Sequence, residues 1–179
     1  MPSCSARGPR ASWPSSPSGG AWRSVLTWWQ WTRRGSGTPS AATRCEIAGP
    51  LTGKLVVVPS NPLTTDAHGN AARVLPKGQS SGKVVAGWLP AGACLAMASG
   101  TLSADLFESA VDRSPEPAVL FYATDDDRAG EEVERLIRTA GFEPVKAGGL
   151  GQSGRLEVGG DLHDLVVGPA QARSLIDGT

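Results

Sequence analysis

Three short runs of apolar residues recur along the chain after residue 50. The first, Lys54-Leu-Val-Val-Val58, ends at Pro59, and the clearest, 118–123, is Ala-Val-Leu-Phe-Tyr-Ala. Continuous apolar runs of this length are typical of strands that are buried on both faces of a parallel sheet. We therefore predict strands at 54–58, 93–98 and 118–123, and a fourth strand at 143–147, after the helix that Gly141 ends.

Segments with helical spacing separate these runs. Between Asp126 and Ala140 apolar residues repeat every three or four positions, and Gly141 follows as a C-terminal stop. Ser80 and Ser103 are suitable N-caps for two shorter helices. The spacing predicts helices at 80–88, 103–111 and 126–140, a weaker helix at 169–176, and a loop at 64–79.

This alternation predicts an α/β fold class, a partial Rossmann-like parallel sheet with flanking helices behind an irregular N-terminal leader. In such sheets ligands lie outside the carboxyl ends of the strands. Three loops are expected to leave those ends, at 60–62, 99–101 and 124–125.

The first 45 residues differ in composition from the rest. They contain six Arg, five of the six Trp and no Asp or Glu, whereas residues 46–179 carry 11 basic and 17 acidic residues. No regular period is present, although 21–31 could form a short helix. A transit peptide, a secretory signal or a nucleic-acid-binding arm fits less well than a disordered or out-of-frame leader. We expect this low-complexity leader at 1–48 and an organised domain at 49–179.

Charge and cysteine content exclude several function classes. The 17 basic and 17 acidic residues cancel, so overall positive charge cannot hold nucleic acid. No apolar run reaches the roughly 18 residues of a membrane span. Three scattered cysteines and two histidines offer no zinc site, and they favour a cytoplasmic protein with reduced thiols.

The segment Gly149–Gly154 matches the dinucleotide-binding pattern GxGxxG. That pattern needs a helix that opens behind the glycines, whereas Val158 here runs into two further glycines. We therefore predict a glycine-rich connector. The acidic run 125–127 is interpreted as a helix cap rather than a metal site, and no nucleophile motif is present. No catalytic residue and no metal ligand is assigned.

Several short motifs in order resemble the coenzyme F-420-dependent NADP oxidoreductase family. They are 51–58 with Ser60-Asn-Pro-Leu63, Ser80-Ser-Gly82, Leu89-Pro-Ala-Gly-Ala93, Phe121-Tyr-Ala-Thr-Asp-Asp126, Gly141-Phe-Glu-Pro-Val145 and Gly148-Gly-Leu150. The resemblance covers about 51–158. One departure is Met97-Ala-Ser-Gly-Thr101, where the family usually reads Lys-Ala-Phe-Asn-Thr.

The resemblance implies an NAD(P)-binding Rossmann oxidoreductase that transfers hydride between NADP and a deazaflavin or another flavin. Small-molecule cofactors are then the expected partners, and a homodimer is left open. The cofactor-binding candidates are Ser60, Asn61 and Pro62 on the nicotinamide side. Ser99, Gly100 and Thr101 are the substrate-side candidates.

Two alternatives stay open at this point. Asn61 can instead be part of a structural Asx turn. The family's N-terminal GxGxxG half has no counterpart in the first 50 residues, so a truncated oxidoreductase with weak NADP binding is expected. The other interpretation is a non-catalytic α/β binding module or an inactive fragment.

Overall fold

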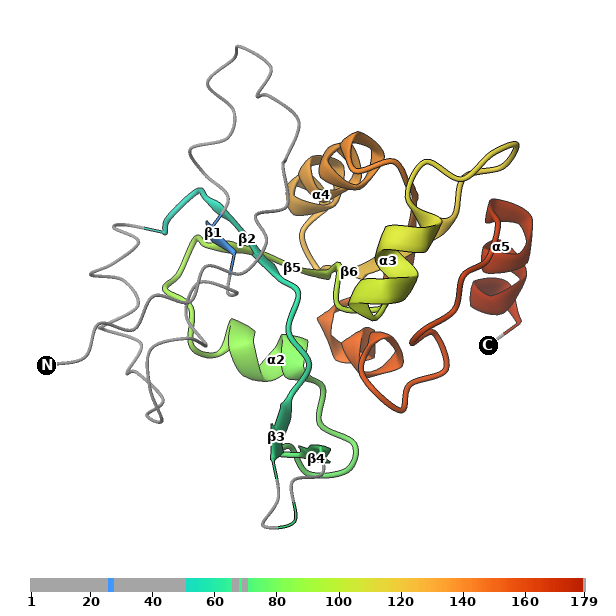
Figure 1. Cartoon of the computed structure of the whole chain (residues 1–179). Helices are drawn as coiled ribbons and strands as arrows, with labels where there is room; N and C mark the ends of the chain where they lie inside the picture. The colour runs from blue at the N-terminus through green and yellow to red at the C-terminus, as the bar shows by residue number, and fades with distance from the viewer. Residues whose placement is uncertain (1–25, 28–50, 66–67, 69–70, 179) are drawn as a thin grey trace, which may run out of the picture.

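The computed structural model describes residues 26–27, 51–65, 68 and 71–178 (Figure 1). Its main sheet has the strand order β1-β2-β5-β6-β7. These strands are β1 Leu26–Thr27, β2 Leu55–Val58, β5 Cys94–Ala98, β6 Val119–Ala123 and β7 Glu143–Gly148. The helices are α2 Ser81–Ala86, α3 Ala104–Ala110, α4 Asp127–Thr139 and α5 Pro169–Asp177, with the 3-10 helix η3 at Leu150–Leu156.

The α/β fold class and all four predicted strands are confirmed, to within a residue or two at their ends. The predicted helices at 80–88, 103–111, 126–140 and 169–176 correspond to α2, α3, α4 and α5. Asp126 is the N-cap of α4, where its carboxylate accepts a hydrogen bond from the Ala129 N–H. The aspartate run therefore caps the helix, as the sequence indicated.

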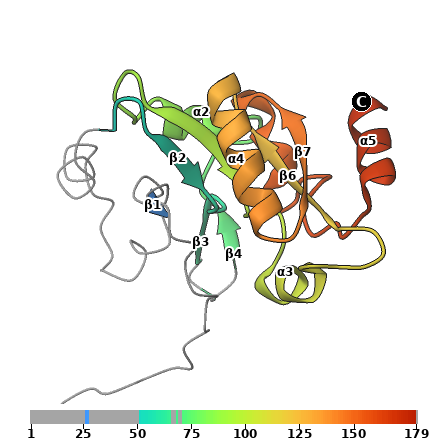
Figure 2. The same cartoon turned by 90° about the horizontal axis from the view of Figure 1, so that it is seen from above.

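The sheet is not parallel throughout. β1, β2 and β5 run parallel, and so do β6 and β7, but β5 and β6 pair antiparallel. The chain therefore does not cross back along the sheet before β6 begins, and α3 lies beyond one end of the strands (Figure 2).

Helices cover both faces of the sheet. One buried cluster joins alternate residues of β5 and β6 to α4, with Val133 and Ile137 at its centre. The other joins the opposite residues to α2, η3 and α5, through Val85, Leu156 and Ala172. All five residues of β6 are buried, which agrees with its continuous apolar run.

Two local predictions are wrong. The loop expected at 64–79 contains an antiparallel hairpin, β3 Leu63–Thr65 and β4 Ala71–Arg73. Strands of three residues are too short to show a period in the sequence. Within the helix suggested at 21–31, residues 26–27 form β1. Other statements about the leader concern residues outside the described part. In that part no helix is long and apolar enough to cross a membrane.

Candidate functional site

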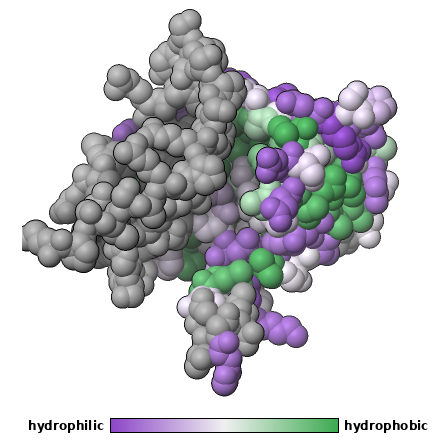
Figure 3. Space-filling model, viewed as in Figure 1, coloured by the Kyte–Doolittle hydropathy of each residue, from purple (hydrophilic) through white to green (hydrophobic). Residues whose placement is uncertain are grey.

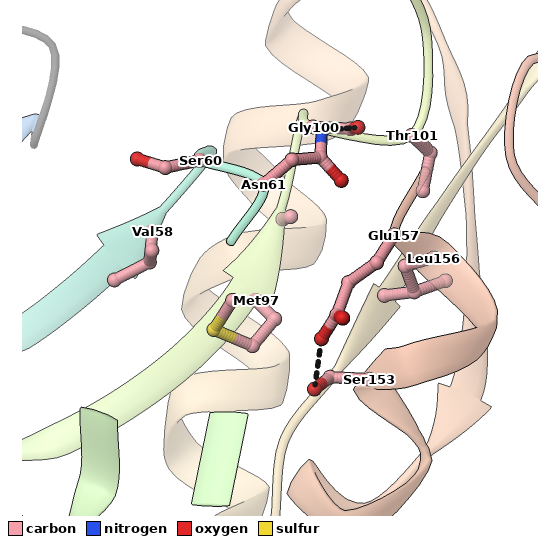
Figure 4. Close-up of a pocket in the computed structure, with 10 residues that line it drawn as sticks. Val58, Ser60, Asn61, Met97, Gly100, Thr101, Ser153, Leu156 and Glu157 are labelled. Carbon is pink, nitrogen blue, oxygen red and sulfur yellow. Dashed lines mark hydrogen bonds between the residues drawn. The ribbon is translucent and has the colours of Figure 1, made fainter. Parts of the chain in front are cut away.

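The loops after β2 and β5 meet at one edge of the sheet. The two strands are parallel neighbours, with Val58 beside Met97, so their carboxyl ends lie together. The Asn61 side chain donates a hydrogen bond from Nδ2 to the Gly100 carbonyl, at 3.1 Å. A Cβ at Gly100 would lie 2.3 Å from the Pro59 carbonyl oxygen, so only glycine allows the loops to approach this closely. Ser60 and Asn61 of the first segment and Gly100 and Thr101 of the second line one pocket (Figure 4), whereas the predicted site residues Pro62 and Ser99 are not among its lining residues.

Asn61 connects three segments of the chain. Besides the bond to Gly100, its Oδ1 accepts a hydrogen bond from the Val158 N–H, at 2.8 Å. A neutral amide has two N–H groups and two lone pairs, so one donor and one acceptor site remain. The side chain thus has a structural role and keeps the capacity to contact a ligand.

The sequence did not predict that η3 forms the opposite wall of this pocket. Residues 149–154, expected to be a connector, mostly belong to this 3-10 helix, which packs on the N-terminus of α2. The Gly82 N–H donates to Ser153 Oγ at 2.9 Å, and Ser80 Oγ donates to the Leu150 carbonyl at 2.9 Å. The small residues at the start of α2 are the sequence signal for this close contact, because a Cβ at Gly82 would lie 2.8 Å from that carbonyl oxygen.

Glu157 is a buried carboxylate at the centre of these contacts. Its Oε1 accepts hydrogen bonds from the Ser81 N–H and hydroxyl, at 2.8 and 2.6 Å. Its Oε2 forms an ion pair with Arg73 of β4. Burial by itself raises the pKa of the Glu157 carboxyl, but the hydrogen bonds from Ser81 and Arg73 outweigh it and lower that pKa below its ordinary value. Glu157 is therefore ionised at neutral pH.

Thr101 has an unsatisfied polar group. Its hydroxyl oxygen is buried and has no hydrogen-bond partner. Among the described residues, every other buried side-chain oxygen or nitrogen has one. The pocket that it lines has a volume of about 10 Å³, which is room for about one water molecule. The structure thus places Ser60, Asn61, Gly100 and Thr101 around one small cavity, together with Ser153 and Glu157.

The third expected loop, 124–125, is not part of this site. Because β6 is antiparallel to β5, its carboxyl end lies at the opposite edge of the sheet, where Thr124 Oγ1 donates to the Leu95 carbonyl at 2.6 Å. Asp125 there accepts from the Lys83 ammonium at 2.7 Å and from the Leu150 N–H at 2.8 Å. These two hydrogen bonds lower the pKa of Asp125. In the described part, no three His, Cys, Asp or Glu side chains are grouped so as to hold a metal ion.

Comparison with known proteins identifies a related fold. No protein-family model and no curated protein matches the chain. A hypothetical protein from Sinorhizobium meliloti is similar over 81% of this chain and 66% of its own, with 25% identity and a TM-score of 0.63. A protein from Arthrobacter sp. FB24, assigned by inference as an F420-dependent NADP reductase, is similar over 63% of this chain and 53% of its own, with 22% identity and a TM-score of 0.49. The chain thus spans at most 66% of these structures, and it shares its α/β fold with the Sinorhizobium protein.

Proposed function

We propose that the chain is an NAD(P)-linked oxidoreductase module that orients a nicotinamide against a deazaflavin or another flavin for hydride transfer. The ordered motifs between residues 51 and 158 support this proposal, because they resemble those of F-420-dependent NADP oxidoreductases. In this proposal Ser60, Asn61 and Pro62 contact the nicotinamide, and the segment 99–101 contacts the flavin.

The observation that carries the proposal is the meeting of these two segments at the carboxyl ends of β2 and β5. Ligands of open α/β sheets lie outside those ends. The two cofactors supply the hydride chemistry, so the protein has to bind and orient them and no acid–base residue is required. Asn61 keeps one donor and one acceptor for a carboxamide, and Thr101 keeps its hydroxyl.

The fit of the described residues to a whole dinucleotide is partial. A cavity of about 10 Å³ does not admit a nicotinamide ring until the loops separate. At Gly149–Gly154 the backbone forms η3, and the Gly149 N–H is bonded to the Gln152 side chain at 2.9 Å. No open phosphate-binding turn is therefore formed by these glycines, so weak NADPH binding is part of the proposal.

The small size of the pocket and the occupied polar groups beside it favour the second candidate, a non-catalytic α/β binding module. Glu157 and Ser153 already satisfy N–H groups at the start of α2, and the pocket beside them has a volume of only about 10 Å³. A module of this kind would hold a small group without transferring hydride.

The test measures oxidation of NADPH, supplied at high concentration, by a deazaflavin or flavin acceptor. The absorbance of the nicotinamide monitors the reaction. We expect acceptor-dependent oxidation in the full chain. Thr101→Val removes one hydrogen bond to the acceptor, worth about 1.4 kcal/mol, so kcat/KM for the acceptor should fall about tenfold. Ser174→Ala, on the exposed side of α5, is the control and should have no effect. If no acceptor supports oxidation, the binding-module alternative is retained.

A further inference from the structure

The Thr101 hydroxyl requires an explanation that the fold does not supply. Its residue is 1% exposed, and its oxygen has no partner. A buried hydroxyl without a hydrogen bond is unfavourable, and native proteins usually satisfy such a group with water or a ligand. The cavity beside Thr101 has room for about one water molecule, so the missing partner belongs there.

The polar groups around this cavity favour an uncharged occupant. Both carboxylate oxygens of Glu157 are engaged, one by Ser81 and the other by Arg73, so no free carboxylate is left to hold a cation. The same ionised carboxylate repels an anion. Ser153 Oγ accepts from the Gly82 N–H and donates to Glu157 Oε1, at 3.4 Å, so it keeps one lone pair. The Thr101 hydroxyl can both donate and accept, as a neutral amide, carbonyl or hydroxyl group requires.

Two contacts tie lining residues of the cavity to neighbouring segments, and we call them the clasp. In one, Arg73 at the end of the hairpin pairs with Glu157, and in the other Asn61 Oδ1 accepts from the Val158 N–H. Both join the chain that follows β2 to the chain that leaves η3. The exposed apolar side chains of Val74 and Val158 lie next in sequence to Arg73 and Glu157, the ion pair of the clasp. Apolar surface also lies where the hairpin joins the rest of the molecule (Figure 3).

We propose that Thr101 anchors a small pocket for a neutral hydrogen-bonding group, and that the clasp must open before any group larger than water can enter. Water occupies the pocket while the clasp is closed. The inference rests on the geometry of the pocket, so it holds even if the proposed hydride transfer fails. If that transfer is correct, the neutral group belongs to one of the two cofactors.

The experiment measures access to position 101 with two small reagents of similar size. Thr101→Cys is made in a background that has no other cysteine and is labelled with neutral iodoacetamide or anionic iodoacetate. Ser174→Cys in the same background is exposed on α5, and it corrects for the intrinsic difference between the reagents. The background changes are Cys4→Ser, Cys45→Ser and Cys94→Ala.

We expect Cys at position 101 to react at least tenfold more slowly than Cys at position 174. After correction, it should favour iodoacetamide over iodoacetate at least tenfold. Arg73→Gln opens the clasp and should raise iodoacetamide labelling of position 101 at least tenfold. Arg128→Gln removes an exposed ion pair on α4 instead, and it should leave the rate unchanged. The faster labelling should not depend on low concentrations of urea, as expected for local opening rather than global unfolding.

Three results would overturn the inference: equal rates at positions 101 and 174, no effect of Arg73→Gln, or equal labelling by the two reagents. Thr101→Val provides a second measurement that needs no cysteine. If the only partner of the hydroxyl is a water that the added methyl group displaces, its removal should leave the melting temperature unchanged or higher. A lower melting temperature would show that the hydroxyl already stabilises the protein and is not kept for a ligand.

Discussion

At the scale of single residues, Glu157 has the most consequences for the structure. Its carboxylate binds the first N–H of α2, the Ser81 hydroxyl and the Arg73 guanidinium, and so connects three segments that are far apart in sequence. The residue is only 3% exposed, so water cannot replace these partners when the carboxylate is lost. The stability of the site therefore depends on this side chain.

Replacing Glu157 by alanine should lower the free energy of unfolding by about 3 kcal/mol. The reason is that the change breaks a buried ion pair and leaves a buried N–H of α2 unsatisfied. Urea denaturation measures the loss. Glu131→Ala, at an exposed position on α4, is the matched control and should change stability by less than about 0.5 kcal/mol. An equally small effect at Glu157 would show that the carboxylate does not hold the three segments together.

The pH dependence of stability should carry the signature of the same group. The folded pKa of Glu157 lies below its ordinary value of 4.5, so in this range the unfolded chain binds more protons than the native one. Its contribution to stability is therefore complete above about pH 4.5 and is lost as the pH falls toward the lowered folded pKa. Glu157→Gln should show a flatter decline of melting temperature below that pH. Parallel profiles for the two proteins would contradict this assignment.

At the scale of elements, the contact between α2 and η3 decides the shape of the site. The two helices approach so closely that the Gly82 N–H reaches Ser153 Oγ and the Ser80 hydroxyl reaches the Leu150 carbonyl. Small residues at the start of α2 make this approach possible. The glycine-rich segment 149–154 is therefore part of the packing rather than an open phosphate loop.

Two glycines of this region allow a matched test of that contact. Gly82→Ala places a Cβ 2.8 Å from the Leu150 backbone oxygen, so it should cost about 1–3 kcal/mol through overpacking. Gly87→Ala, at the other end of α2, meets nothing closer than 3.4 Å at a helical φ of −66°, so it should be neutral or stabilise by up to about 1 kcal/mol. Thermal or urea unfolding of both variants decides the point. Similar effects of the two changes would mean that α2 and η3 do not touch as described.

At the scale of the whole molecule, the direction of β6 determines which loops share an edge of the sheet. Because β5 and β6 are antiparallel, the segments 60–62 and 99–101 lie at one edge and 124–125 lies at the other. The candidate site is therefore formed by two strand ends and by η3. No described segment at that edge presents a glycine turn followed by a free helix N-terminus.

For this reason NADPH should bind weakly or not at all to the purified 179-residue chain. Dinucleotide affinity depends largely on charge-assisted hydrogen bonds to the phosphates, at about 1.5–3 kcal/mol each, and the loss of several removes factors of ten. Titration calorimetry measures the affinity directly. A dissociation constant in the low micromolar range, on the order of −8 kcal/mol, would show that a phosphate site exists outside the contacts described above.

Local chemistry determined most of the fold from the sequence. The apolar runs specified β2, β5 and β6, because a strand buried on both faces has to be apolar throughout. Capping residues and three-to-four spacing marked the helices. The motif order also placed Asn61 and Thr101 at strand ends, which the structure brings to one pocket. Their roles toward cofactors stay predictions.

Only the tertiary structure decided the direction of β6, the hairpin at 63–73, and the participation of Arg73, Ser153 and Glu157 in the site. Each of these depends on contacts between residues that are distant in sequence, such as the ion pair between positions 73 and 157. A periodic pattern indicates which side of an element is buried, but it does not indicate which residues that side packs against. The orphaned hydroxyl of Thr101 likewise becomes visible only when every neighbour around it has been placed.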